Sequence, residues 1–194
     1  MRTRLALRFA VVLALLAPAH ARAASEADEA IQKTLKGLVN SIRYGKDDLA
    51  AQKVAFRSMG PQLLTDEWGK FSPAEQAEIG RGLETIVRAL SFKKGREMFQ
   101  YLDALLFEPA RIDGDKAKAK STIVVHRDLK KAEIIIDWVL VKEAGTWKVL
   151  DTIMLGESTL AGLRDDQVKP LFRQGGTPAV MKALRDKVAE VKKG

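Results

Sequence analysis

The sequence predicts a single α+β domain in which helices wrap around a curved, four-stranded antiparallel sheet. Apolar residues follow helical spacing in the first part of the chain and again near its end, whereas strand-forming residues dominate the middle. No internal repeat or low-complexity linker divides this order, and the chain contains no cysteine that could form a disulfide. Packing of apolar side chains must therefore hold the fold together.

The first 23 residues have the three parts of a secretory signal peptide. Three arginines precede an uncharged apolar run over residues 9–19, and Ala21-Arg22-Ala23 supplies the small residues of a cleavage site. As a helix this run spans roughly 16 Å, about half of the roughly 30 Å hydrocarbon core of a bilayer. We therefore predict a signal peptide over 1–23, export to the periplasm, and one mature domain over 24–194 that is not an integral membrane protein.

Much of the basic character belongs to this leader. Four of its residues are arginines and none is acidic, so its removal lowers the net charge from +8 to +4. The remaining charges are dispersed, which argues against a nucleic-acid partner. The mature chain keeps only His126 among histidines and lacks cysteine, so we predict no metal site, cysteine nucleophile or cofactor.

Several helices are predicted before and after the strands in the sequence. The first starts at Ser25 as N-cap, and the second covers 47–59 and ends at Gly60-Pro61. The clearest start is Ser72-Pro73-Ala74-Glu75, a capping box with proline at the first helical position. The remaining predicted helices lie after Gly95, around 165–173 with Gly175-Gly176 as its end, and from Thr177 onward.

Four strands form the predicted antiparallel meander. They cover residues 105–112, 116–127, 131–142 and 146–155. The second strand alternates, with Ala119, Ser121 and Ile123 on one face and lysines on the other. The third strand is apolar on both faces apart from Asp137, as a strand covered on both sides would be. One face can pack on helices while the other lines an apolar cavity between the sheet and the helices.

A family resemblance emerges from motifs spread over most of the mature chain. They are Trp147-Lys-Val-Leu-Asp151-Thr-Ile-Met-Leu-Gly156-Glu-Ser158, Trp68 followed by Phe71-Ser-Pro-Ala-Glu-Gln76, the tandem Gly175-Gly176, and Leu184 with Lys187. Their spacing and order after a signal peptide resemble the MlaC family, periplasmic phospholipid-binding proteins also known as toluene-tolerance proteins. Relatives of this family are also linked to hopanoid lipids, so the resemblance leaves a hopanoid cargo as an alternative to phospholipid.

The resemblance implies a lipid carrier rather than an enzyme. Such a carrier shuttles phospholipid between an inner-membrane ABC transporter complex and an outer-membrane lipoprotein complex, and so maintains outer-membrane lipid asymmetry. Burying a methylene contributes about 0.8 kcal/mol, so an acyl chain needs an apolar cavity to cross water. We predict that the lipid-binding residues are Ile123, Val125, Ile136, Trp138, Leu140 and Ile153 from the sheet and Leu83, Ile86, Val87, Phe99 and Leu102 from the helices.

Two other classes of function fit the same fold. Helix-wrapped curved sheets of the nuclear-transport-factor-two-like kind also host small isomerases and dehydratases, and under that hypothesis Asp137, Asp151 and His126 converge in one pocket. Alternatively, the protein is a periplasmic interaction module whose cavity is filled by its own side chains. Ser158 lies in Gly-Glu-Ser rather than Gly-x-Ser-x-Gly, so we expect Asp151 and Ser158 to end the fourth strand and start the next turn.

Overall fold

The computed structural model describes residues 17–193, with side chains from Ser25 onward. The predicted signal peptide therefore lies largely outside the described residues. Helix α1 covers Ala17–Arg43, so Ser25 lies within the helix and the predicted N-cap at Ser25 is wrong. The physical reason is the alanine-rich composition around Ser25, since alanine has the highest helix propensity and nothing in this stretch stops the helix.

The second predicted helix is divided into α2 (Asp47–Ala51) and α3 (Phe56–Leu64). Between them the chain pairs with the sheet: Ala55 donates its N–H to the Val149 carbonyl at 2.8 Å. The predicted end at Gly60-Pro61 is also wrong, because both residues lie inside α3. Gly60 instead allows close packing, since a Cβ there would lie 2.6 Å from the Trp68 ring.

The capping box at Ser72 is confirmed. Ser72 accepts a hydrogen bond from the Glu75 N–H at 3.3 Å, and its own N–H donates to the Glu75 carboxylate at 2.8 Å. A short 3₁₀ turn, η1 (Thr65–Lys70), precedes this helix, α4 (Pro73–Ile86). The helix then continues through a π-helical segment, η2 (Val87–Phe92), into α5 (Lys93–Phe99), so the helix expected after Gly95 is the end of a longer one.

The strands form one curved, open antiparallel sheet, and the α+β prediction is confirmed. The strand order is β1-β3-β4-β5-β6, and β2 also pairs with β3. The first predicted strand is divided because Pro109 cannot donate a ladder hydrogen bond. The strands are β1 (Leu102–Phe107), β2 (Arg111–Asp113), β3 (Lys116–Arg127), β4 (Lys130–Glu143), β5 (Thr146–Met154) and β6 (Glu157–Ser158).

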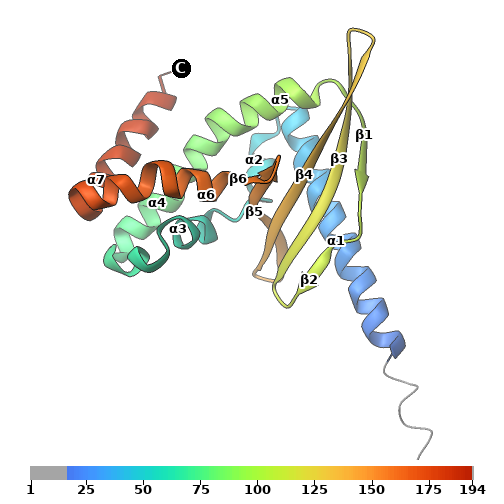
Figure 1. Ribbon diagram of the computed structural model, residues 1–194, viewed down its shortest axis with the longest axis horizontal. Coiled ribbons are helices and arrows are strands. Elements are labelled where there is room, and N and C mark those ends of the chain that lie inside the picture. The colour runs from blue at the N-terminus through green and yellow to red at the C-terminus, as the bar shows by residue number, and fades with distance from the viewer. Residues whose placement is uncertain (1–16, 194) are drawn as a thin grey trace, which may run out of the picture.

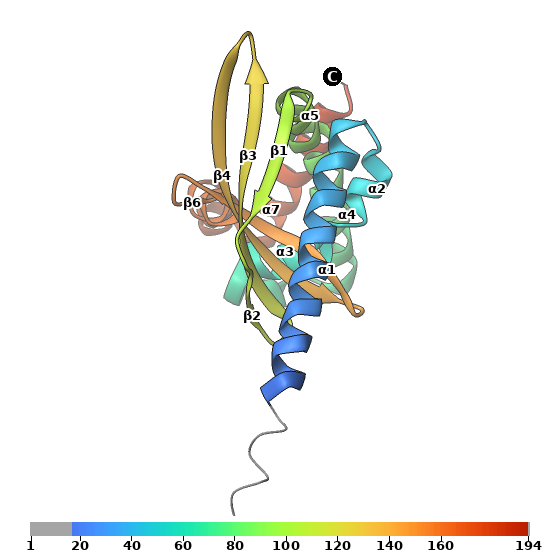
Figure 2. The same ribbon diagram turned by 90° about the vertical axis from the view of Figure 1, so that its right-hand side faces the viewer.

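Only one face of the central strands is well covered. Helices α1 and α5 lie on one side of β1, β3 and β4 (Figure 2), and on the buried face the Trp138 indole donates a hydrogen bond to Ser121 at 2.8 Å. Leu106 and Ile135 both occupy positions opposite Thr122, and each is more than half exposed. The prediction that the third strand is covered on both sides is therefore wrong, because no helix within residues 17–193 packs over this part of its outer face.

The chain ends in a helical layer beside the sheet (Figure 1). Helix α6 (Thr159–Leu163) leads into a second π-helical segment, η3 (Arg164–Val168), and then α7 (Lys169–Val191). The predicted break at Gly175-Gly176 is confirmed, since both residues have non-helical backbone angles and φ of Gly176 is +61°. No helix within residues 17–193 is both long and apolar enough to cross a membrane.

Candidate functional site: a cavity among the helices

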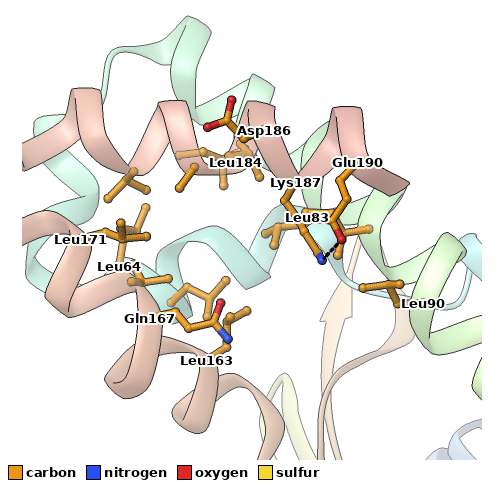
Figure 3. A pocket seen from close by; sticks show the side chains of 16 residues that line it. Leu64, Leu83, Leu90, Leu163, Gln167, Leu171, Leu184, Asp186, Lys187 and Glu190 are labelled. Carbon is orange, nitrogen blue, oxygen red and sulfur yellow. Dashed lines mark hydrogen bonds and ion pairs between the residues drawn. The ribbon is translucent and has the colours of Figure 1, made fainter. Parts of the chain in front are cut away.

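An apolar cavity of about 560 Å³ lies between helices α3 and α4 and the C-terminal helices α6 and α7 (Figure 3). Its walls come from α3, α4 with η2, α6 with η3, and both halves of α7. This volume lies in the range of small-molecule sites, roughly 300–1,000 Å³. The apolar lining residues are Leu63, Leu64, Ile79, Leu83, Ile86, Leu90, Leu163, Val168, Leu171, Val180, Ala183 and Leu184.

Packing of α7 against α4 closes one side of the cavity. Gly82 of α4 makes this approach possible, because a Cβ on Gly82 would lie 2.8 Å from a methyl carbon of Leu184. Arg185 then donates two hydrogen bonds to the Glu78 carboxylate, at 2.7 and 2.8 Å. These bonds from Arg185 hold the pKa of Glu78 below its ordinary value. The backbone break at Gly175-Gly176 lets the second half of α7 turn back to make these contacts.

Four polar side chains complete the lining. They are Gln167, Asp186, Lys187 and Glu190. Lys187 pairs with Glu190 at 2.7 Å, next to Leu83 and Leu90 (Figure 3). Asp186 pairs with Lys182 at 2.5 Å. The cavity therefore combines an apolar interior with a small number of charged groups from the last turns of α7.

Both π-helical segments border this cavity. Leu90 belongs to η2, whereas Gln167 and Val168 belong to η3. A π-helix is rare, and short π-helical turns occur frequently at functional sites because they shift the side chains of one helical turn relative to the next. Their presence on two sides of one cavity marks this location as the candidate functional site.

The structure places two of the predicted lipid-binding residues, Leu83 and Ile86, in the cavity wall. The others lie elsewhere, because the covered face of the sheet is filled by its own side chains and by helices α1 and α5. Ile123, Ile136, Trp138, Leu140 and Phe99 are buried in the core, and Val87, Leu102, Val125 and Ile153 are partly buried. Contact of these residues with a lipid stays a prediction.

Sequence reasoning missed most of the lining, above all Leu63, Leu64, Leu163 and Leu171. The apolar stripe of α7, with Val180 and Leu184, was visible in the sequence. The partners of this stripe depend on the direction in which the helix continues after Gly175-Gly176. The sequence predicts a break there but does not predict that direction.

Asp137, Asp151 and His126 do not form a common pocket. His126 lies opposite Lys131, and Asp137 is six residues further along β4, or roughly 20 Å along the strand. The Asp151 carboxylate accepts hydrogen bonds from the Ser158 hydroxyl and the Leu160 N–H. In the described part of the chain, no three histidine or acidic residues form a group that could hold a metal ion.

Comparison with known families identifies the chain's relatives. The model of the MlaC protein family matches residues 24–186. The chain belongs to the MlaC family. No protein with a curated description matches this sequence.

A solved structure shares the fold of this chain. A phospholipid-binding protein from Ralstonia solanacearum, solved in complex with a phospholipid, is 15% identical, with a TM-score of 0.67 over 86% of this chain and 98% of its own. At this identity the likeness shows a shared fold.

Two further structures are more distant. A protein whose name marks it as an NTF2 variant is 12% identical, with a TM-score of 0.42 over 66% of this chain and 96% of its own. A protein of unknown function from Mycobacterium tuberculosis is 11% identical, with a TM-score of 0.36 over 91% and 96%. Both are too distant to support an argument about fold or function.

Proposed function

We propose that this protein is a lipid carrier that shields acyl chains from water in the helical cavity. The observation that supports this function is a cavity of about 560 Å³ with 12 apolar lining residues in a chain of the MlaC family. The phospholipid complex of the Ralstonia solanacearum protein supports the same class of ligand. We take a phospholipid as the ligand, because the charged groups on α7 suit a polar headgroup better than the hydrocarbon skeleton of a hopanoid.

The energetics of an acyl chain fit this cavity. Each buried methylene contributes about 0.8 kcal/mol, so a chain of roughly 16 carbons is held by more than ~10 kcal/mol against exposure to water. The leucine-rich lining offers no competing hydrogen bonds. Three of the four polar lining residues lie on α7, and the fourth, Gln167, lies on η3. A ligand with an apolar tail and a polar head matches this distribution.

We further propose where the carrier works. The leader over residues 1–23 directs it to the periplasm, where it exchanges phospholipid with an inner-membrane ABC transporter complex and an outer-membrane lipoprotein complex. Transport of this kind maintains the lipid asymmetry of the outer membrane. The chain lacks a phosphate-binding loop for ATP, so the energy for directional transfer comes from the transporter.

Native mass spectrometry tests lipid carriage directly. The protein is purified from periplasm without detergent, its mass is measured in the folded state, and the bound lipid is extracted and identified. A bound phospholipid in wild-type protein is the expected result, whereas a clean apo mass combined with no uptake from phospholipid vesicles would overturn the proposal.

A matched pair of variants ties the lipid to the helical cavity. Ala183 lines the cavity, whereas Ala189 is exposed on the same helix and is absent from the lining. Ala183→Phe should reduce the bound lipid several-fold, because the larger ring occupies the space of several methylenes. Ala189→Phe should carry as much lipid as wild type, and equal loss in both variants would place the lipid elsewhere.

A further inference from the structure

We infer that a groove on the open face of the sheet, opposite α1 and α5, binds an acidic amphipathic helix of a partner protein (Figure 2). The groove has a volume of about 380 Å³ and shares no lining residue with the helical cavity. Its lining comes from β2, β3, β4 and β5 and from Gln62 of α3. Because the groove is separate from the cavity, this inference does not depend on lipid carriage.

Three unpaired cations line the groove. Arg111, Lys116 and Lys118 are exposed, and none of them forms a hydrogen bond or ion pair through its side chain with the described residues. Arg111 and Lys118 lie directly opposite each other on β2 and β3, and like charges at such positions destabilise a sheet. Within the described part of the chain, Asp113 is the one acidic side chain of the lining. The groove therefore has an excess of positive charge that the fold itself does not use.

Apolar side chains lie beside these cations on the same face. In the register of β3 with β4, Val139 lies opposite Lys118 and Val141 lies opposite Lys116. Both valines are half-buried and line the groove. An apolar column on β4 therefore runs beside a cationic column on β3, and an apolar sheet face is commonly covered by a helix.

The spacing of the two columns fits one helix. Alternate residues of a strand lie roughly 7 Å apart, and residues one helical turn apart have Cβ atoms roughly 5–6 Å apart. Acidic residues at every fourth position can therefore reach Lys116 and Lys118 in turn, while an adjacent apolar stripe packs on the two valines. A second copy of this chain would instead set the cations against each other across a two-fold axis. A flat lipid surface would reach the exposed lysines but not the half-buried valines.

A synthetic helix tests the groove. A fluorescent helical peptide carries glutamate at every fourth position and leucine next to each glutamate, and its binding to protein purified from periplasm is measured by fluorescence anisotropy. Lys118→Glu should weaken binding about tenfold, because it replaces an attraction with a repulsion. Lys94 is exposed on α5 and is absent from the groove lining. Lys94→Glu makes the same change in net charge and should stay within about twofold of wild type.

Further variants separate charge from packing. Asp113→Asn removes an acid from the lining and should tighten peptide binding, whereas Val139→Thr should weaken it with no change in net charge. A peptide with glutamine in place of glutamate should bind weakly, and binding of the acidic peptide should fall with added salt because the cations are exposed. Lys118→Glu removes the like-charge pair with Arg111, so its thermal unfolding temperature should equal or exceed that of wild type.

Contrary outcomes overturn the inference in distinct ways. If wild-type protein does not bind the peptide, or if Lys118→Glu and Lys94→Glu weaken binding equally, the groove is not a docking site for an acidic helix. If Lys118→Glu abolishes binding to phosphatidylglycerol vesicles and leaves peptide binding unchanged, the face contacts a membrane. A dimer in analytical ultracentrifugation that Lys118→Glu disrupts would assign the face to a second copy.

The lipid content keeps the two proposals apart. Native mass spectrometry of Lys118→Glu should show as much bound lipid as wild type, because the groove and the cavity share no lining residue. Loss of lipid in Lys118→Glu alone would show that the groove is not an independent site. A clean apo mass of wild-type protein that still binds the peptide would contradict lipid carriage and leave the groove as inferred.

Discussion

The Ser158 hydroxyl donates a hydrogen bond of 2.5 Å to the Asp151 carboxylate and joins the end of β5 to the start of α6. Ser158 is also the N-cap of α6, since its oxygen accepts the Ala161 N–H at 2.9 Å. The other Asp151 oxygen accepts the N–H groups of Thr152 and Leu160 at 2.8 and 3.0 Å. These two motif residues therefore fix the direction of α6, which carries Leu163 into the cavity wall.

Substitutions at this junction should lower the stability of the fold, because the two side chains have a structural role. Ser158→Ala should lower the free energy of unfolding by about 1 kcal/mol, the usual cost of a lost N-cap. Asp151→Asn should cost about 2 kcal/mol, because both carboxylate oxygens accept hydrogen bonds and the amide nitrogen that replaces one of them cannot accept. Urea denaturation measures both. Asp137→Asn is the control, since its side chain forms no hydrogen bond or ion pair among the described residues, and an equal loss there would contradict the assignment.

Local signals in the sequence predicted local structure well. Ser72-Pro73-Ala74-Glu75 gave the start of α4, and Gly175-Gly176 gave the break in α7, because capping and backbone freedom act over a few residues. The order of strands β3, β4 and β5 followed from strand composition and short turns. The same local reasoning was wrong at Pro61, where packing of Gly60 on Trp68 keeps the helix intact.

The candidate site depends on contacts between distant segments, and the sequence contained no comparable signal for it. The cavity exists because Leu184 packs on Gly82 and Arg185 binds Glu78, residues about 100 positions apart. Apolar strands and apolar helices look alike as candidate linings when their relative positions are unknown. The third predicted strand is apolar on both faces, so the sequence favoured a cavity lined by the sheet. In the structure the cavity lies among the helices.

The buried pair of Trp138 and Ser121 should be energetically coupled. Ser121→Ala leaves the indole N–H without a partner in the core and should cost about 1–3 kcal/mol. Trp138→Phe should cost more, because it also removes apolar volume. In the double variant the loss should be smaller than the sum of the two single losses, since neither polar group remains unpaired. Additive losses in urea denaturation would show that the hydrogen bond contributes nothing.

The capping box should make stability depend on pH through Glu75. Hydrogen bonds from the hydroxyl and N–H of Ser72 lower the pKa of Glu75 below its ordinary value of 4.5. A carboxyl whose pKa is lower in the folded state stabilises the fold above the unfolded pKa, and this contribution is lost as the pH falls. The destabilisation caused by Glu75→Gln should therefore shrink between pH 7 and pH 3. In a Ser72→Ala background this pH dependence should weaken, because the hydroxyl donor is lost while the backbone N–H of residue 72 remains, and an unchanged dependence would assign it to another group.

The effect of Gly82→Ala on the free energy of unfolding should change sign when Leu184 is replaced by alanine. Alanine is favoured over glycine within a helix by about 1 kcal/mol, so Gly82→Ala would stabilise an isolated α4. In the folded chain the new Cβ would meet the Leu184 side chain at 2.8 Å, so the gain should be cancelled or reversed. In a Leu184→Ala background the contact is gone, and Gly82→Ala should stabilise by up to about 1 kcal/mol. Equal effects in both backgrounds, measured by thermal unfolding, would mean that α7 does not pack on Gly82.

The turn between β3 and β4 should gain stability from glycine. Asp128 and Leu129 have φ of +50° and +63°, and such two-residue turns strongly favour glycine at the second position. Leu129 is fully exposed, so its replacement loses no packing. Leu129→Gly should therefore raise the free energy of unfolding by about 1 kcal/mol, because a non-glycine residue in this region is strained. Lys130→Gly, at the first residue of β4, is the control and should destabilise instead. A loss of stability in both variants would show that the strain at Leu129 is relieved in solution.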